Sequence, residues 1–164
     1  MQKIQSICYI EENYLNKKRL IMEYKITQGT VGVRPNVTLP NPEILNVLGE
    51  DGMRALTKEH YEILRHSEIK DLFPPNDAGI EMAIKHASDF FIQICGGQRH
   101  FDQNRGRPMM AARHSPFKID QAARVIWLEA YATILEDTNL SEELKESFWQ
   151  YLDIFSIWMM NTRD

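Results

Sequence analysis

A histidine that directly follows an arginine lies in the stretch AARHSPFKI, residues 111–119. Proline lacks an N–H group and restricts the residue before it, so a helix should end close to His114 and the chain should turn away after Ser115. A histidine in the last turn of a short helix can act as a C-terminal cation, as a buried hydrogen-bonded group or as a metal ligand. The local sequence leaves these three roles open.

Two other side chains with useful chemistry lie at the edges of apolar helical stripes. Tyr61 follows His60 in the stretch EHYEIL, and Trp127 lies in the stretch ARVIWLEA. A buried tyrosine needs a partner for its hydroxyl, and an indole N–H can only donate a hydrogen bond. The two residues are therefore candidate donors to a polar ligand. The alternative is a boundary tyrosine that touches water and a tryptophan that packs in the core.

The bulk composition of the 164 residues, 43% hydrophobic and 26% charged, is typical of a single soluble globular domain. The net charge of −4 gives a nucleic-acid-binding surface no electrostatic support. Cys8 and Cys95 lie far apart and lack the close Cys or His spacing of a zinc site. No apolar run is long enough to span a membrane, and residues 1–22 do not resemble a signal peptide. We therefore expect a cytoplasmic protein without nucleic-acid or membrane partners.

The spacing of apolar residues predicts an all-α fold with four long helices and one short one. Residues 3–22 are a candidate amphipathic helix, and residues 30–43, which contain three prolines, are an expected extended connector. Apolar stripes then predict helices over residues 51–66 and 79–95. Paired glycines follow the second of these helices and should end it, because glycine accepts the left-handed conformation of a C-cap.

The second half of the chain must position the histidine. A loop is expected at residues 98–108, before the short helix that ends at His114. Asp120 and Ser141 are expected to cap two long helices, the first of which runs to about Glu136. The predicted buried face of that helix consists of Ile119, Ala122, Ala123, Ile126, Ala130 and Ile134.

Five motifs carry a resemblance to a known family: EHYEIL, DLFPP, CGGQRHF, RGRPMMAARHSPFKI and ARVIWLEA. In this order and near this spacing they resemble the truncated haemoglobins, and they are most similar to the group II branch. The match covers about residues 42–137 well. It implies a two-over-two truncated globin fold at residues 43–164, preceded by an N-terminal extension at residues 1–42. It also implies one non-covalent b-type haem, iron protoporphyrin IX.

The resemblance gives a role to each candidate residue. His114 would be the proximal ligand of the haem iron, and Arg113 would pair with a haem propionate. Tyr61 and Trp127 would donate hydrogen bonds to a ligand on the distal side. The residues that would contact the haem are Phe73, Ala83, Ala87, Phe90, Met110, Arg113, Phe117, Ile119 and Trp127.

The distal helix should leave room above the iron, since Ala83 and Ala87 are small and one turn apart. Phe90 would close the apolar wall beyond them. His86 lies one position off the apolar stripe, so we expect it at the rim and not as a distal ligand. His60 departs from the family, which usually has phenylalanine before its tyrosine.

A protein of this kind would bind O2 reversibly, and NO or CO as well. It could support NO detoxification or peroxide chemistry, with electrons from an unidentified reductase. Two alternatives remain open. One is a haem-based sensor or interaction protein that uses residues 1–42 as its output surface, and the other is a cofactor-free helical protein that keeps the globin pattern only as a core.

Overall fold

The computed structural model describes residues 22–164, and every regular element in that range is helical. The long helices are α2 (Glu43–Leu64), α3 (Asp77–Ile94), α6 (Gln121–Glu136) and α7 (Glu142–Ile157). The short helices are α4 (His100–Arg105) and α5 (Met110–His114), and a single 3-10 turn spans Lys70–Leu72. None of these helices is long and apolar enough to cross a membrane.

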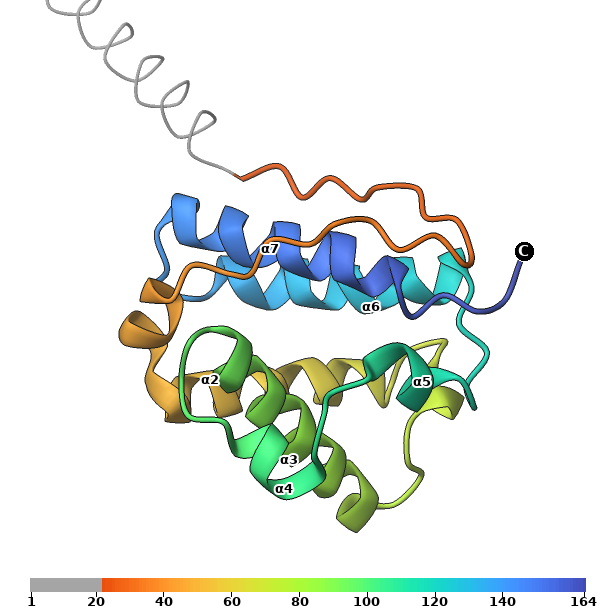
Figure 1. The fold of residues 1–164 in the computed structure, drawn as a ribbon, viewed down its shortest axis with the longest axis horizontal. Coiled ribbons are helices and arrows are strands. Elements are labelled where there is room, and N and C mark those ends of the chain that lie inside the picture. The colour runs from red at the N-terminus through yellow and green to blue at the C-terminus, as the bar shows by residue number, and fades with distance from the viewer. Residues whose placement is uncertain (1–21) are drawn as a thin grey trace, which may run out of the picture.

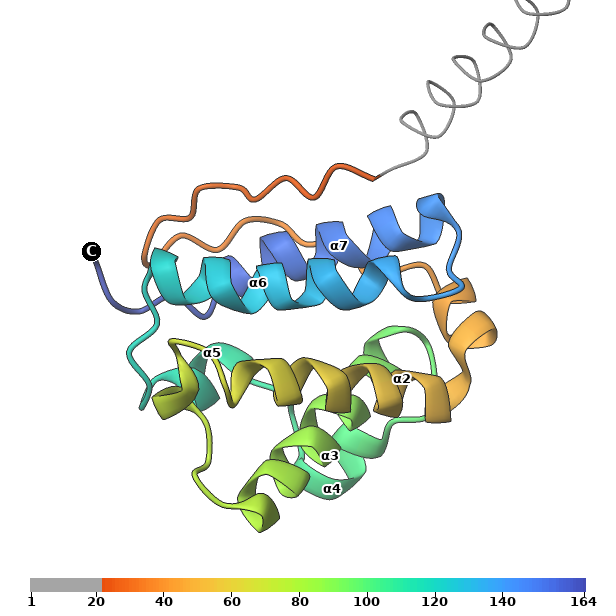
Figure 2. The ribbon, with the colours of Figure 1, turned by 180° about the vertical axis from the view of Figure 1, so that it is seen from behind.

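The long helices form two layers, as Figures 1 and 2 show. Helices α6 and α7 lie antiparallel in one layer, and α2 and α3 form the other, together with α4 and α5. The layers meet in an apolar core to which Leu56, Phe91, Leu128 and Phe148 contribute. The structure therefore confirms the predicted all-α fold with two helices packed over two.

Polar side chains start three of the long helices. The side chain of Asn76 accepts a hydrogen bond from Gly79 N, Asp120 accepts one from Ala123 N, and Ser141 accepts one from Leu144 N. Each of these side chains satisfies a backbone N–H that has no partner within the first helical turn. The caps predicted at Asp120 and Ser141 are confirmed.

Two glycines fix where helices bend or end. Gly49 has φ 69° and ψ 172°, and it kinks α2 near its start. A first helical stretch precedes the kink, so α2 begins at Glu43 and not near residue 51, where the apolar stripe starts. Gly96 has φ 86°, a left-handed value that stops α3 directly after Cys95.

Two sequence predictions are wrong. The expected loop at residues 98–108 contains α4, since the side chain of Gln93 accepts a hydrogen bond from Asp102 N and donates one to the Asp102 carboxylate. Such a tertiary contact leaves no trace in apolar spacing. Ala122 is exposed, because α6 turns Ala123 and Arg124 toward the interior instead. The helix predicted at residues 3–22 falls outside the described residues, apart from Met22.

An extended segment, residues 22–42, runs along α7 and turns back on itself (Figure 1). Trp149 of α7 and Trp158, directly after α7, hold the backbone of this segment. Trp149 Nε1 donates to the Lys25 carbonyl and Trp158 Nε1 donates to the Pro35 carbonyl, both at 2.9 Å. The absence of helical periodicity in residues 30–43 correctly predicted an extended conformation.

A buried ion pair joins this segment to both helices of the upper layer. Arg124 of α6 is 2% exposed, and its guanidinium donates to the Asp153 carboxylate at 2.5 Å and to the Thr27 carbonyl at 2.6 Å. Asp153 in turn accepts from Thr27 N and from the Thr27 hydroxyl, at 3.0 and 2.7 Å. Each buried charge is thus paired and hydrogen-bonded, which offsets the cost of its desolvation.

Candidate functional site

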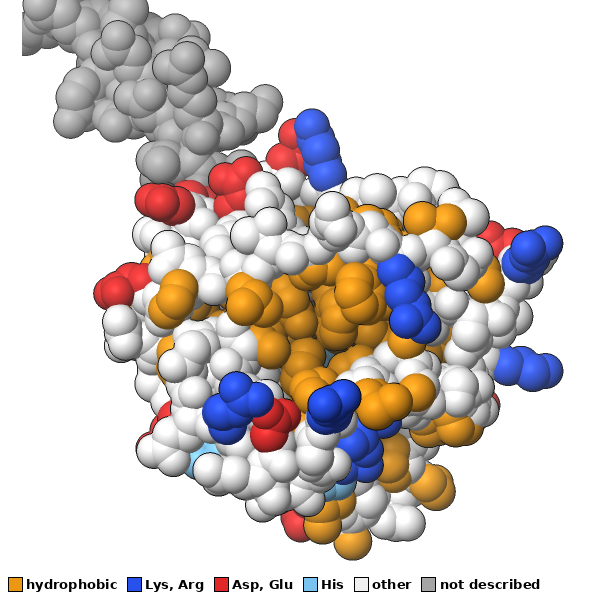
Figure 3. Space-filling model, in the orientation of Figure 1, with side chains coloured by type: hydrophobic (Ala, Val, Ile, Leu, Met, Phe, Trp, Pro, Cys, Tyr) orange, Lys and Arg blue, Asp and Glu red, His pale blue; other side chains and the backbone are white. Residues whose placement is uncertain are grey.

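A cavity of about 440 Å³ lies between the two layers. Figure 3 shows it as a hollow lined by hydrophobic side chains, with Lys and Arg side chains around its edge. Every residue that the sequence predicted for the site lines this cavity: Tyr61, Phe73, Ala83, Ala87, Phe90, Met110, Arg113, His114, Phe117, Ile119 and Trp127. The structure therefore brings together side chains from four separate helices, α2, α3, α5 and α6, and from the segments between them.

His114 is the last residue of α5 and lines the cavity. Its Nδ1–H donates to the Met110 carbonyl at 2.7 Å, which fixes the tautomer and leaves a lone pair on Nε2. Burial lowers the pKa of His114, so the ring is neutral near pH 7. A neutral imidazole with its second nitrogen held by a carbonyl is the usual state of a metal-ligating histidine.

The described part of the chain offers no complete metal site by itself. Within residues 22–164, no group of three or more His, Cys, Asp or Glu side chains is placed to hold a metal ion. A metal at His114 would therefore need most of its ligands from a group other than the protein.

The turn after His114 is held by a residue far along the chain. Asn161 Nδ2 donates to the carbonyls of His114 and Phe117, at 3.2 and 2.7 Å. Its Oδ1 accepts from Ile119 N at 2.9 Å. Asn161 thus fixes the backbone on which three cavity residues lie, a role that no sequence signal indicated.

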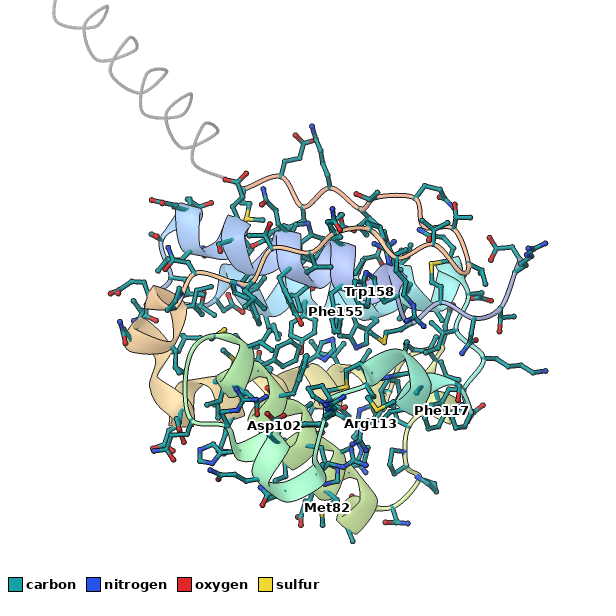
Figure 4. The ribbon with its side chains drawn as sticks, in the orientation of Figure 1. Met82, Asp102, Arg113, Phe117, Phe155 and Trp158 are labelled. Atoms are coloured by element: carbon teal, nitrogen blue, oxygen red, sulfur yellow. The ribbon has the colours of Figure 1, made fainter. Side chains whose placement is uncertain are left out.

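Arg113 of α5 lies close to α4 (Figure 4). Its Nε donates to the Pro108 carbonyl at 2.7 Å, and Nη2 donates to the carbonyls of Arg105 and Arg107 at 2.8 and 3.1 Å. The guanidinium also lies 5.3 Å from the centre of the Phe101 ring. These contacts brace the loop before α5, and they engage three of the five guanidinium N–H groups.

Tyr61 on α2 and Trp127 on α6 both line the cavity, one from each layer. The Tyr61 ring packs edge-on against Phe73, with 5.6 Å between ring centres. Burial raises the pKa of Tyr61 to about 12, so the phenol keeps its proton at neutral pH. Both side chains can therefore donate a hydrogen bond, and both line the same space.

His60 also lines the cavity, although its position in the sequence indicated no role. It is fully buried, and its Nε2–H donates to the Trp127 carbonyl at 3.0 Å. Its ring stacks on Tyr131, with 3.5 Å between ring centres. Burial lowers the pKa of His60 to about 3, so the ring is neutral. The only sequence signal was a histidine on an otherwise apolar stripe.

His86, predicted to lie at the rim because it is off the α3 stripe, also lines the cavity. It is half-buried and lines the cavity together with Arg105 and Arg113. Its pKa is lowered by burial and by the positive charges of Arg105 and Lys85. The stripe itself places Ala83 and Ala87 on the cavity wall.

Comparison with known proteins gives a family match over most of the chain. A family described as "Bacterial-like globin" matches residues 45–161. The group 2 truncated hemoglobin YjbI of Bacillus subtilis (strain 168) is 26% identical over 115 residues, which are 70% of this chain and 85% of that protein.

Solved structures match at the level of the fold. The crystal structure of phosphate-bound Hell's gate globin IV is 35% identical, with a TM-score of 0.77 over 85% of this chain and 88% of that one. The group II truncated haemoglobin of Bacillus anthracis is 23% identical, with a TM-score of 0.68 over 80% of this chain and 96% of that one. These matches confirm the resemblance that the five motifs indicated.

Proposed function

Because the chain belongs to the bacterial-like globin family, whose members bind haem and diatomic gases, we propose that its cavity holds one b-type haem with His114 as the axial ligand. The observation that carries this proposal is the state of His114: Nδ1–H is held by the Met110 carbonyl, and the ring faces an apolar cavity. Residues 43–164 are then the globin domain, and residues 1–42 are its extension.

The cavity fits a flat, largely apolar group with a charged edge. Its walls are apolar, and arginines lie at its rim. Phe73, Ala83, Ala87, Phe90, Met110, Phe117 and Ile119 would contact the porphyrin. Arg113 keeps its Nη1 group outside the three carbonyl contacts, and that group would bind a propionate. The single protein ligand also suits a metal whose other ligands come from the porphyrin.

When bound, the haem supplies an iron at which O2, NO or CO can bind. The protein supplies two hydrogen-bond donors, Tyr61 and Trp127, that line the same cavity as His114. The Tyr61 hydroxyl keeps its proton at neutral pH, and the Trp127 indole N–H can only donate. Both would stabilise a ligand that gains negative charge, and they would slow its release.

Slow release argues against simple O2 delivery and favours a reaction of the bound gas. We propose NO detoxification or peroxide chemistry, with a reductase that returns the iron to its ferrous state. The test is the rate of NO consumption by the haem-loaded ferrous protein in air, with nitrate measured as the product. Stoichiometric nitrate formation supports the proposal. NO loss without nitrate would leave peroxide turnover as the reaction to assay.

A second function, gas sensing, is supported by the contacts of Arg124. Arg124 lines the cavity and also donates to the Thr27 carbonyl in the extended segment. A change at the cavity wall could therefore reach residues 22–42. Amide hydrogen exchange of this segment, compared with and without CO on the haem-loaded protein, tests the idea. Equal exchange in the two states would contradict it.

A further inference from the structure

The turn that carries the proposed iron ligand is tied to the C-terminal tail, residues 158–164, at Asn161. The side chain of Asn161 donates from Nδ2 to the carbonyls of His114 and Phe117. Its Oδ1 accepts from Ile119 N, and its backbone N donates to the Ile119 carbonyl, both at 2.9 Å. One residue of the tail therefore contacts both ends of the turn.

Helix α5 is too short to fix its own position. It has five residues, and the last four carbonyls of a helix have no partner within that helix. The His114 carbonyl is one of these, and it accepts from Phe117 N at 3.0 Å and from Asn161 Nδ2 at 3.2 Å. An isolated helix of this length is unstable in water, so the place of α5 at the cavity depends on contacts of this kind.

The tail on either side of Asn161 is held by the extended segment. Trp158 Nε1 donates to the Pro35 carbonyl at 2.9 Å. Met160 is buried, and its sulfur packs so close to Gly29 that a Cβ added there would lie 2.5 Å away. Asn161 is thus presented to the turn by neighbours that are themselves fixed.

We propose that Asn161 is a positioning residue for the iron ligand, which it holds through the His114 carbonyl. The inference rests on the proposed haem binding at His114. The imidazole is bonded through Nδ1 to the Met110 carbonyl of the same helix, so the ring moves with α5. A shift of α5 therefore moves Nε2 and changes the strength of its bond to the iron.

Position and stability can be measured separately at this residue. Asn161 is exposed, so water can replace the partners that its side chain loses. Substitution of Asn161 should therefore lower the thermal midpoint of unfolding only slightly. Its effect should appear in the iron–histidine bond instead.

Resonance Raman spectroscopy of the ferrous haem-loaded full chain, with no gas bound, measures the iron–histidine stretching band. In Asn161→Ala this band should broaden and move to lower frequency, because α5 then takes a range of positions. Asn161→Asp keeps an acceptor for Ile119 N but has no donor for the His114 carbonyl, and it should change the band in the same way. Arg163→Ala, at an exposed position of the tail, is the matched control and should keep the wild-type band.

Added imidazole separates positioning from a change in cavity shape. In His114→Gly supplied with imidazole, the ligand of the iron is not attached to α5. Combining this variant with Asn161→Ala should therefore leave the iron–imidazole band unchanged. A shift there as large as that in the wild-type background would show that Asn161 acts through the shape of the cavity, and would overturn the assignment.

The other outcomes are equally distinct. A wild-type band in Asn161→Ala, even with a large fall in the thermal midpoint, would show a purely structural role and overturn the inference. A wild-type band in Asn161→Asp alone would assign the effect to the Ile119 contact and overturn it as well. A wild-type chain that holds no haem would instead refute the proposed function, and this inference with it.

Discussion

His114 and His60 line the same cavity and use their ring nitrogens in opposite ways. His114 binds a carbonyl through Nδ1 and presents Nε2, whereas His60 binds a carbonyl through Nε2 and leaves Nδ1 without a protein partner. Both rings are neutral because burial lowers their pKa values. The comparison shows how one residue type can take opposite tautomers in one cavity, according to which ring nitrogen donates to a carbonyl.

The carbonyl contacts of the two histidines also differ in how far they reach along the sequence. His114 takes its carbonyl from Met110, four residues earlier on the same short helix. His60 takes its carbonyl from Trp127, 67 residues away on another long helix. The Nδ1 contact of His114 therefore depends on local sequence, whereas the Nε2 contact of His60 exists only when α2 packs on α6.

The largest difference between the two histidines should appear in haem retention. We predict that His114→Gly abolishes stable haem binding, because His114 is the proposed protein ligand of the iron. Added imidazole should restore binding, since the cavity left by the side chain can admit it. The ratio of haem to protein after gel filtration measures this effect. Full retention in the variant without imidazole would contradict the assignment.

The two proposed donors, Tyr61 and Trp127, should control the rate of ligand release. A hydrogen bond to a charged or strongly polarised acceptor contributes roughly 1.5–3 kcal/mol, or about ten- to 150-fold in a rate constant. Tyr61→Phe and Trp127→Phe should each speed O2 dissociation by about this factor, and CO dissociation much less. The double variant should be non-additive, since both donors address one ligand.

Stopped-flow dissociation of both gases from the four proteins checks these rates. Equal changes for O2 and CO would indicate an altered cavity shape instead of lost hydrogen bonds. Unchanged dissociation rates in a single variant would show that the substituted residue donates no hydrogen bond to the bound ligand.

A pH titration of stability should single out the buried histidine. Burial lowers the pKa of His60 from 6.5 to about 3, so between these values the unfolded chain binds a proton that the folded chain does not. The contribution of His60 is thus complete above pH 6.5, and stability falls as the pH falls from there toward 3. In His60→Phe the loss should be smaller by up to about 1.4 kcal/mol per pH unit.

Urea unfolding of the haem-free chain at several pH values between about 4.5 and 7 measures this slope. His66→Ala is the control, since His66 is exposed and its removal should leave the slope unchanged. Parallel profiles for wild type and His60→Phe would show that the His60 ring is protonated in the folded chain or is open to water.

The smallest effect is expected at the rim. His86→Ala should leave the ferric and ferrous coordination spectra almost unchanged, because His86 lies beside Arg105 and Arg113 at the cavity edge. A six-coordinate wild-type spectrum that this substitution removes would place His86 over the iron, and the comparison would then need a third histidine.

What the sequence could predict follows the same division. The helix starts at Asp120 and Ser141 were predictable, since each depends on residues within a few positions along the chain. Local sequence also predicted that a short helix ends at His114, but only the resemblance assigned roles to His114 and Arg113. The buried stripe of α3 was predictable from its period.

The missed features depend on distant partners. The contact of His60 with the Trp127 carbonyl and the support of the 114–119 turn by Asn161 appear only after packing. Helix α4 is likewise stabilised by Gln93, and Arg124 is buried because Asp153 and Thr27 lie opposite it. Apolar periodicity carries no information about such polar pairs, so these residues were read as loop, surface or core.

The central claim is that His114 binds the iron of a haem in this cavity. Resonance Raman spectroscopy of the deoxygenated ferrous protein tests it most directly, because the iron–histidine stretching band reports that one bond. The band should be present in the wild type. In His114→Gly supplied with imidazole, it should be replaced by an iron–imidazole band that shifts when the imidazole is isotopically labelled. An unchanged iron–histidine band in His114→Gly would show that another residue binds the iron.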